Sequence, residues 1–407
     1  MCIRDRHYEG AQGAGGEPDP KTVDVISRFY TRVKQEYLNP GIAEGEDKER
    51  AENARWERLL EIAERTNDNR PVMTSEYAHS MGNALGNFKE YWDEIYSNPR
   101  MLGGFIWDWV DQTFAIKDKN NRDIWAFGGD MGFVGIVNDS NFCANGLVAA
   151  DRSLHPHIYE VKKVLQYIHF EPVAFTPNKI KVSNRHDFIG LEGYTLRWAV
   201  ECDGKAVQGG EMDFPVITPG SSANIELPLK ALPADGKEYF LTLRAFTKHE
   251  APLIPKGHEV AIEQWILPTT QIAGKVQPAN STLATDRNNE AITLKGNNFQ
   301  IAFSTQNGEM TELIYHGKNL IKEGLQPNFW RPLTDNDIPN GHLNRCATWK
   351  TAGKDAKLEN LEVTEKQQIV IVTVTYKMEA QGSTLQTIYD IHPNGAVRVS
   401  MHFTPGK

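Results

Sequence analysis

Residues 71–112 read PVMTSEYAHSMGNALGNFKEYWDEIYSNPRMLGGFIWDWVDQ and carry the strongest structural signal in this chain. Pro71 suits the first position of a strand, and that strand ends on Glu76. Aromatic and aliphatic residues then recur at helical spacing over 84–96, and a second strand is predicted over 105–110. Two strands joined by a crossover helix predict a parallel α/β sheet.

Glu76 and Trp107 fall at the carboxyl ends of these two predicted strands. In a (β/α)8 barrel the reacting groups stand at this end of the strands. A carboxylate there suits the nucleophile of a retaining glycoside hydrolase, which needs two carboxyl groups about 5–5.5 Å apart. The alternative is an ion-paired structural glutamate at the rim of a barrel.

Three further side chains suit a sugar site. His79 lies in the turn, where its imidazole would hydrogen-bond a sugar hydroxyl or tune Glu76. Trp107 would stack on the apolar face of a pyranose. Tyr8, in HYEG at 7–10, ends another candidate strand, and its hydroxyl would orient a nucleophile or donate a proton. The structural alternatives are a satisfied histidine at 79 and a core tryptophan at 107.

A polar loop at 138–146, NDSNFCANG, is rich in amide and carbonyl oxygens, which hard cations prefer as ligands. Plain turns are the commoner reason for such Asn and Gly clusters. His155 and His157 resemble a metal-ligand pair, but the proline between them and the lack of nearby carboxylates argue against metal binding. The DND segment at 335–337 is predicted to be a turn.

Length, charge and cysteine usage exclude several classes of protein. The chain of 407 residues is long enough for roughly two to three domains, and its net charge of -9 argues against nucleic-acid binding. No apolar run approaches the ~18 residues that a membrane helix needs. Four scattered cysteines without a CxxC pair predict free thiols rather than a disulfide framework or a zinc site.

The hydrophobic pattern divides the chain into an α/β part and two all-β parts. Residues 1–166 are helix-rich, with one helix predicted over about 47–65. Over 167–268, alternating apolar residues and an Asp203-Gly204 hairpin turn predict a β-sandwich. A polar linker is predicted at 269–290 and a second, unfinished β domain at 291–407, with strands at 299–303, 310–315, 369–376, 384–390 and 396–403.

Two blocks in the first part carry a family resemblance: EYAHSMGN at 76–83 and GGFIWDWVDQ at 103–112. Supporting matches are HYEG at 7–10, FGGD at 127–130, ND at 138–139, FCANGLV at 142–148, DR at 151–152 and NFWRPLTDND at 328–337. Together they closely resemble glycoside hydrolase family 2 β-galactosidases of the bacterial LacZ type. A related family 2 β-glucuronidase or β-mannosidase, or a non-catalytic carbohydrate-binding β-sandwich protein, stays open as an alternative.

The resemblance implies the C-terminal part of a TIM barrel, then an immunoglobulin-like β-sandwich and an incomplete second β-sandwich. It also implies retaining hydrolysis of terminal non-reducing β-D-galactosides such as lactose. Glu76 would be the nucleophile, and Tyr8 would assist departure of the sugar. His79 would contact the galactose hydroxyls, and Trp107 would lie under the galactose.

The same resemblance implies Mg²⁺ and Na⁺ as cofactors and a homo-oligomer, a tetramer in the family. Asn145 and the Phe142 carbonyl would help hold the sodium ion, and Asn138 would lie near a magnesium-associated loop. Nothing in 1–75 matches the acid/base glutamate or the magnesium ligands of the family. We therefore expect the chain to be an internal piece of a longer protein and to be inactive alone.

Overall fold

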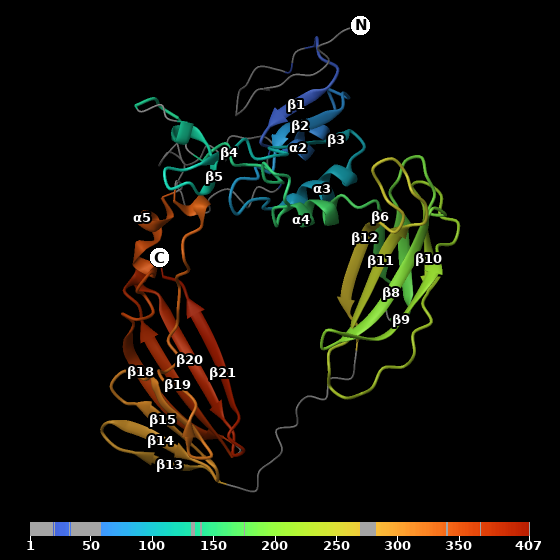
Figure 1. Ribbon diagram of the computed structural model, residues 1–407. Coiled ribbons are helices and arrows are strands. Elements are labelled where there is room, and N and C mark those ends of the chain that lie inside the picture. The colour runs from blue at the N-terminus through green and yellow to red at the C-terminus, as the bar shows by residue number, and fades with distance from the viewer. Residues whose placement is uncertain are drawn as a thin grey trace. The chain divides into compact units, whose positions relative to one another are not determined.

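The computed structural model forms two compact units, one of residues 1–233 and 237–269 and one of residues 234–236 and 270–407 (Figure 1). The structure describes residues 19, 21–31, 33, 58–131, 135–138, 141–174, 176–268, 282–338, 341–366 and 368–406. Among these residues, no helix is long and apolar enough to cross a membrane. The cysteines in this part of the chain, Cys143, Cys202 and Cys346, are free thiols, as predicted.

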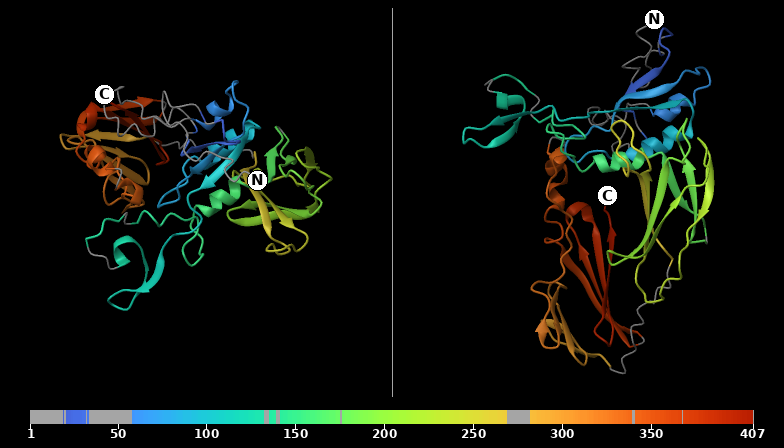
Figure 2. Two further views of the ribbon diagram at one scale, coloured as in Figure 1. Left: turned by 90° about the horizontal axis from the view of Figure 1, so that it is seen from above. Right: turned by 45° about the vertical axis from the view of Figure 1, so that its right-hand side comes forward.

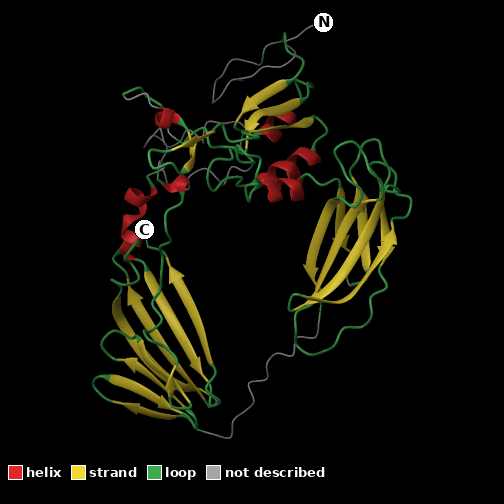
Figure 3. Cartoon of the chain, in the orientation of Figure 1, coloured by secondary structure: helices red, strands yellow, loops and turns green. Residues whose placement is uncertain are grey.

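The first unit begins with a parallel sheet in the order β1-β2-β3, formed by Ile26–Phe29, Val72–Tyr77 and Met101–Ile106. Helix α2, Leu59–Ala63, precedes β2, and helix α3, Phe88–Ser97, joins β2 to β3 (Figure 3). The predicted parallel pair with its crossover helix is therefore confirmed. Since parallel strands end at the same edge of a sheet, residues that follow β2 and β3 lie together.

A small apolar core holds both helices on this sheet. It consists of buried side chains from the strands and from α2 and α3: Ile26, Leu59, Ile62, Ala63, Val72, Ile95 and Met101. Each fully buried aliphatic side chain contributes roughly 1.5–3 kcal/mol of transfer free energy. This core fixes the position of the strand ends, where the candidate site lies.

The element boundaries differ from the prediction in three places. Helix α3 starts four residues late, because Leu85 and Asn87 have left-handed backbones with φ of 67° and 62°. Strand β3 covers Met101–Ile106 rather than 105–110, because Met101 is already buried and pairs with Val72 and the last pair with β2 is made by Ile106. Strand β1 was not predicted, since its four residues, ISRF, are too few to show a period.

The helix predicted over 47–65 is described only at its end, as α2, and residues 47–57 lie outside the described part. Beyond β3, the chain forms a two-stranded hairpin of β4, Phe114–Lys117, and β5, Asp123–Ala126. A short 3-10 helix, Gly128–Met131, and helix α4, Ile158–Val164, complete this part.

The rest of the first unit is a β-sandwich, and all of its strand pairs are antiparallel. One sheet has the order β10-β7-β6, formed by Ser222–Glu226, Lys179–Asn184 and Ile168–Pro172. The other has the order β12-β11-β8-β9, formed by Glu259–Ile266, Phe240–Thr247, Tyr194–Cys202 and Lys205–Asp213. The predicted hairpin turn is confirmed, because Asp203 and Gly204, with φ of 50° and 73°, connect β8 to β9.

The second unit is also built of two antiparallel sheets whose inner faces share one core (Figure 2). The first is formed in sequence order by β13 to β17: Ala284–Arg287, Ala291–Lys295, Phe299–Ser304, Met310–Tyr315 and Lys318–Asn319. The second is formed by β18 to β21: Lys357–Lys366, Ile369–Lys377, Thr384–Ile391 and Val397–Thr404. All five strands predicted here are present, and β14, β17 and β18 were missed.

Two segments of this unit correct the prediction. Strand β13 lies inside the predicted linker; its four residues are all exposed, so they lack the apolar alternation that marks a strand. The DND turn is one turn of 3-10 helix, Asp335–Asp337, and the Arg331 guanidinium pairs with the Asp337 carboxylate at 2.5 Å. This segment lies between β17 of the first sheet and β18 of the second.

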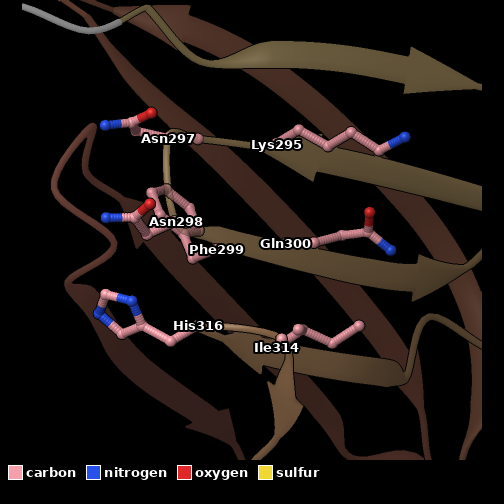
Figure 4. A pocket seen from close by; sticks show the side chains of 9 residues that line it. Lys295, Asn297, Asn298, Phe299, Gln300, Ile314 and His316 are labelled. Carbon is pink, nitrogen blue, oxygen red and sulfur yellow. The ribbon is translucent and has the colours of Figure 1, made fainter.

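A shallow hollow of about 410 Å³ opens at the turn between β14 and β15. Figure 4 shows Asn297, Asn298 and His316 gathered at this turn, and Lys295, Gln300 and Ile314 side by side on neighbouring strands. The hollow contains none of the site residues predicted from the sequence.

Candidate functional site

Glu76 lies at the carboxyl end of β2 and is buried, with 8% of its surface exposed. Its carbonyl oxygen accepts hydrogen bonds from the Tyr30 backbone N–H at 2.8 Å and from the Thr74 hydroxyl at 2.7 Å. Tyr30 directly follows β1 and Thr74 lies in β2, and in this strand pair Glu76 lies opposite Phe29. The backbone that carries this carboxylate is therefore held from two sides.

The turn after β2 is hydrogen-bonded to the residue after β3. The Trp107 N–H donates to the Tyr77 carbonyl at 3.1 Å, and the Ser80 N–H donates to the Trp107 carbonyl at 2.7 Å. The Trp107–Asp108 peptide bond is cis. His79 and Trp107, which were predicted to share a site, are thus brought to the same end of the sheet beside Glu76.

Helix α3 supports this turn through Tyr77, which is 1% exposed. The Trp92 indole N–H donates to the Tyr77 hydroxyl at 3.0 Å, and the Tyr91 ring meets the Tyr77 ring edge-on at 5.2 Å. Burial raises the pKa of Tyr77 to about 12, so its hydroxyl stays protonated at neutral pH. Tyr77 therefore connects the helix to the residues that flank Glu76.

His79 is half-buried, and its Nε2 has no hydrogen-bond partner in the described part of the chain. Its ring lies 5.0 Å from the Phe142 ring and 6.2 Å from the Tyr30 ring, between centroids. Burial lowers the pKa of His79, and the negative charge of Glu76 opposes this shift only in part. The imidazole is thus neutral at neutral pH, with a ring nitrogen left to bond a ligand hydroxyl.

Trp107 keeps 36% of its surface exposed although its backbone is bonded on both sides. An indole held at a strand end with a free face suits stacking on an apolar surface such as that of a sugar ring. The exposed fraction argues against the alternative of a core tryptophan.

Asn145 is 2% exposed, and its two side-chain atoms differ in their partners. The amide Nδ2 donates to the Phe142 carbonyl at 3.0 Å, whereas Oδ1 is buried without a hydrogen-bond partner in the described residues. The reverse orientation of the amide would place two acceptor oxygens together. A buried amide oxygen beside a carbonyl fits the predicted sodium site, because hard cations take oxygen ligands.

His155 and His157 hold the segment that carries Asn145. The His155 Nε2 lies 2.7 Å from the Asp111 carboxylate, and the His157 Nε2 lies 2.9 Å from the Gly146 carbonyl. The argument that no carboxylate is near this pair was therefore wrong, because Asp111 is distant only in sequence. The described residues contain no group of three His, Cys, Asp or Glu side chains that could hold a metal ion.

Three family models match successive parts of the chain. The models are the TIM barrel domain of glycosyl hydrolases family 2 at residues 4–170, β-galactosidase domain 4 at 180–268 and the β-galactosidase small chain at 295–407. A β-galactosidase of Priestia megaterium is 32% identical over 342 residues, 84% of this chain and 33% of the relative. The chain belongs to glycoside hydrolase family 2.

A second family 2 relative, a β-galactosidase of Psychromonas ingrahamii, is 32% identical over 416 residues, 97% of this chain and 39% of the relative. The chain thus spans little more than a third of the length of these curated relatives. A β-D-mannosidase structure from Dictyoglomus thermophilum aligns with 62% of this chain and 27% of that chain, at 13% identity and a TM-score of 0.20. That score is too low to support an argument.

Two expectations from family 2 are not confirmed in the described part of the chain: a Tyr8 hydroxyl beside Glu76 and a magnesium-associated loop near Asn138. Tyr8 lies outside the described residues, so its place relative to Glu76 stays a prediction. Asn138 is exposed, and its side-chain amide donates to the Ile136 carbonyl at 3.2 Å. Alone it does not make a magnesium site, and its neighbour Asp139 lies outside the described residues.

The structure adds two residues that the sequence analysis missed, Tyr30 and Asp111, and a ring contact of Phe142, whose carbonyl alone was predicted to take part. The rings of Phe142 and Tyr30 enclose His79, and Asp111 contacts the Asn145 segment. Phe142 and Asp111 lie within the blocks FCANGLV and GGFIWDWVDQ that carry the family resemblance, but nothing in those blocks indicates which side chains meet. Tyr30 follows the unpredicted strand β1 and carried no signal.

Proposed function

We propose that the full-length protein is a retaining glycoside hydrolase that releases terminal β-D-galactose from β-D-galactosides such as lactose. The position of Glu76 carries this proposal: a buried carboxylate at the end of a parallel strand, beside a neutral His79 and a partly exposed Trp107. The match to the family 2 barrel model and the names of the relatives support it.

In the proposed reaction, a Glu76 carboxylate oxygen attacks the anomeric carbon of galactose. The bond from that carbon to the aglycone oxygen breaks, and the leaving oxygen takes a proton from a general acid that we expect outside the described residues. Water then attacks the galactosyl ester, its proton passes to the same acid/base group, and galactose is released. Configuration at the anomeric carbon is retained because it is inverted twice.

The neighbouring side chains would orient the sugar. The unpartnered Nε2 of His79 would bond a galactose hydroxyl, and Trp107 would lie against the apolar face of the ring. Tyr8 would stand beside the nucleophile and assist departure of the sugar. The roles of His79 and Trp107 follow the family resemblance together with the hydrogen bonding and exposure of these side chains, and the role of Tyr8 follows the resemblance alone.

We also propose that Asn145 Oδ1 and the Phe142 carbonyl are ligands of a sodium ion, with the remaining ligands outside the described residues. Bound there, the ion would supply a positive charge that contacts a sugar hydroxyl. A magnesium ion near the loop of Asn138 and a homotetramer are further proposals that rest on the family alone.

The proposed domain division is a partial TIM barrel at 1–166, an immunoglobulin-like sandwich at 167–268, a linker from 269 and a second sandwich domain to 407. The sandwich of three and four antiparallel strands supports the second of these assignments. The model matches at 4–170, 180–268 and 295–407 are compatible with this division.

Glu76→Gln in the full-length protein tests the nucleophile, because an amide cannot form the galactosyl ester. We expect kcat on a chromogenic β-galactoside to fall by at least about a thousandfold, or ~4 kcal/mol of barrier, with an unchanged unfolding temperature. Glu90→Gln on α3 is the matched control and keeps wild-type turnover. Near-normal turnover of Glu76→Gln would reject the assignment.

A panel of chromogenic glycosides tests the choice of sugar. The relatives' names favour galactosides, so kcat/KM should be highest for the β-galactoside. A preference for the glucuronide or the mannoside would reject galactosides as the substrate. It would not affect the assignment of Glu76 as the nucleophile.

A further inference from the structure

The segment that carries Asn145 runs beside the segment that follows Trp107. Backbone hydrogen bonds connect the two: Asp108 N to Asn145 O, Leu147 N to Asp108 O, Val148 N to Trp109 O, Asp111 N to Val148 O and Gln112 N to Cys143 O, all at 2.7–3.1 Å. These bonds place the Asn145 backbone next to residues 108–112, which directly follow Trp107, the proposed sugar-stacking residue.

The Asp111 carboxylate joins this segment to a histidine from a third part of the chain. One oxygen accepts the Gly146 N–H at 2.7 Å, and the other lies 2.7 Å from the His155 Nε2. The Asp111 side chain is 13% exposed and that of His155 33%. Since a carboxylate only accepts, the His155 Nε2 must carry the proton in this contact.

The peptide groups around Asn145 are thus held by groups from other segments. The Gly146 N–H is bonded by Asp111, the Gly146 carbonyl by His157, and the Asn145 carbonyl by the Asp108 N–H. His155 and His157 stack with ring centroids 5.4 Å apart. Neither Asp111 nor His155 bonds the Asn145 side chain, so their influence on Oδ1 passes through the backbone.

We infer that Asp111 and His155 are positioning residues that hold the buried Asn145 oxygen where it can bind a cation. The inference rests on the proposed function only in taking sodium as that cation. Partners that orient a metal ligand typically change affinity by about 10–100-fold when removed. Asn145 Oδ1 has no hydrogen-bond partner among the described residues, and the backbone at Asn145 and Gly146 is held by hydrogen bonds. The segment therefore holds this oxygen in place for a cation, which a plain turn would not do.

The test measures sodium binding without a galactoside. The unfolding temperature of the full-length protein is followed while NaCl replaces choline chloride at constant ionic strength, and the sodium concentration that gives half of the rise is recorded. In Asp111→Asn this concentration should increase about tenfold or more, because the amide has one acceptor oxygen and cannot accept from both the Gly146 N–H and the His155 N–H. Asn145→Ser, which shortens the ligand itself, should show at least the same shift.

Two substitutions of His155 distinguish the loss of its hydrogen bond from a change in the size of its side chain. His155→Phe keeps a ring but loses the donor, so it should shift the sodium midpoint as Asp111→Asn does. His155→Gln keeps an N–H near the Nε2 position and should restore most of the affinity. The double variant Asp111→Asn/His155→Phe should be no worse than the stronger single variant, since both break one contact. Asp123→Asn, which breaks the exposed Lys117 pair, is the control and should leave the midpoint unchanged.

Unchanged sodium midpoints in Asp111→Asn and His155→Phe would overturn the inference. An equal loss of unfolding temperature in NaCl and in choline chloride would also overturn it, because the pair would then only stabilise the fold. If Asp111→Asn does not fold, the comparison of His155→Phe with His155→Gln decides. A wild-type protein with no sodium-dependent rise rejects the inference, whereas a rise without hydrolysis of any galactoside rejects the proposed substrate alone.

Discussion

Glu76 is a buried carboxylate whose backbone is held by Tyr30 and Thr74. A carboxylate at the carboxyl end of a parallel strand has the position that a nucleophile needs in a barrel of this kind. The proposed purpose is to form a covalent bond to a sugar, and the neighbouring His79 is kept neutral by its own burial. Because the His79 imidazole is neutral, it does not neutralise the negative charge of the Glu76 carboxylate.

At the scale of single residues, the sequence proposed which side chains form the site but not which contacts they make. Glu76, His79, Trp107 and Asn145 were predicted from their place in recognisable motifs, and the structure places the first three at one end of the sheet. The contact of Asp111 with Gly146 spans 35 positions and has no local period, so it could not be predicted. Only tertiary packing brings such residues together.

His169 on β6 gives a pH-dependent prediction. Burial, aided by the positive charge of Arg185, lowers the pKa of His169 from 6.5 to about 4. Between these values the unfolded chain binds the proton and the folded one does not, so the free energy of unfolding falls as the pH drops through this window. The loss should be on the order of 2–3 kcal/mol.

His169→Gln removes this titration but keeps an N–H donor for the Gln166 carbonyl. Urea unfolding at neutral pH and near pH 4 should show a smaller acid-induced loss of stability in the variant than in the wild type. Equal losses in the two proteins would show that another group is responsible.

At the scale of elements, predictability followed the length and the period of each segment. In β8 and β11 apolar and polar residues alternate along the sequence, with Leu196, Val200, Leu241 and Leu243 fully buried, which is the pattern that predicted a β-sandwich over 167–268. Strand β13 is exposed along its length and was taken for linker. Strand β1 is short, and the late start of α3 depends on left-handed residues that no apolar period reveals.

Gly146 gives a prediction about the loop of Asn145. A Cβ at this position would lie 2.2 Å from the Asp111 nitrogen and 2.5 Å from the Val148 carbonyl oxygen, both backbone atoms that cannot move aside alone. Gly146→Ala should therefore lower the free energy of unfolding by at least about 2 kcal/mol or displace the loop. Thermal unfolding measures the first effect and the sodium midpoint the second.

Gly86→Ala is the control for this substitution, because nothing lies within 4 Å of the added Cβ. It should change stability by less than about 1 kcal/mol, with a small gain from the stiffer unfolded chain. Equal effects of the two alanines would contradict the close approach described at Gly146.

At the scale of the whole molecule, the chain holds one end of a parallel sheet and two β-sandwich folds, in two compact units. The sequence predicted this class of fold because periods of 3.6 and 2 occupy different parts of the chain. The family models match those same parts in the same order. The described residues supply Glu76 as the proposed nucleophile, and a retaining mechanism needs a second carboxyl group besides it.

The most direct test of the central claim is covalent labelling. The full-length protein is incubated with a fluorinated galactoside that has a good leaving group, so that the galactosyl-enzyme forms faster than it is hydrolysed. Proteolysis and mass spectrometry then locate the label. The account predicts a single galactosyl ester on Glu76, in the peptide that contains TSEYAH. A label on any other side chain, or hydrolysis of galactosides without a covalent adduct, would contradict it.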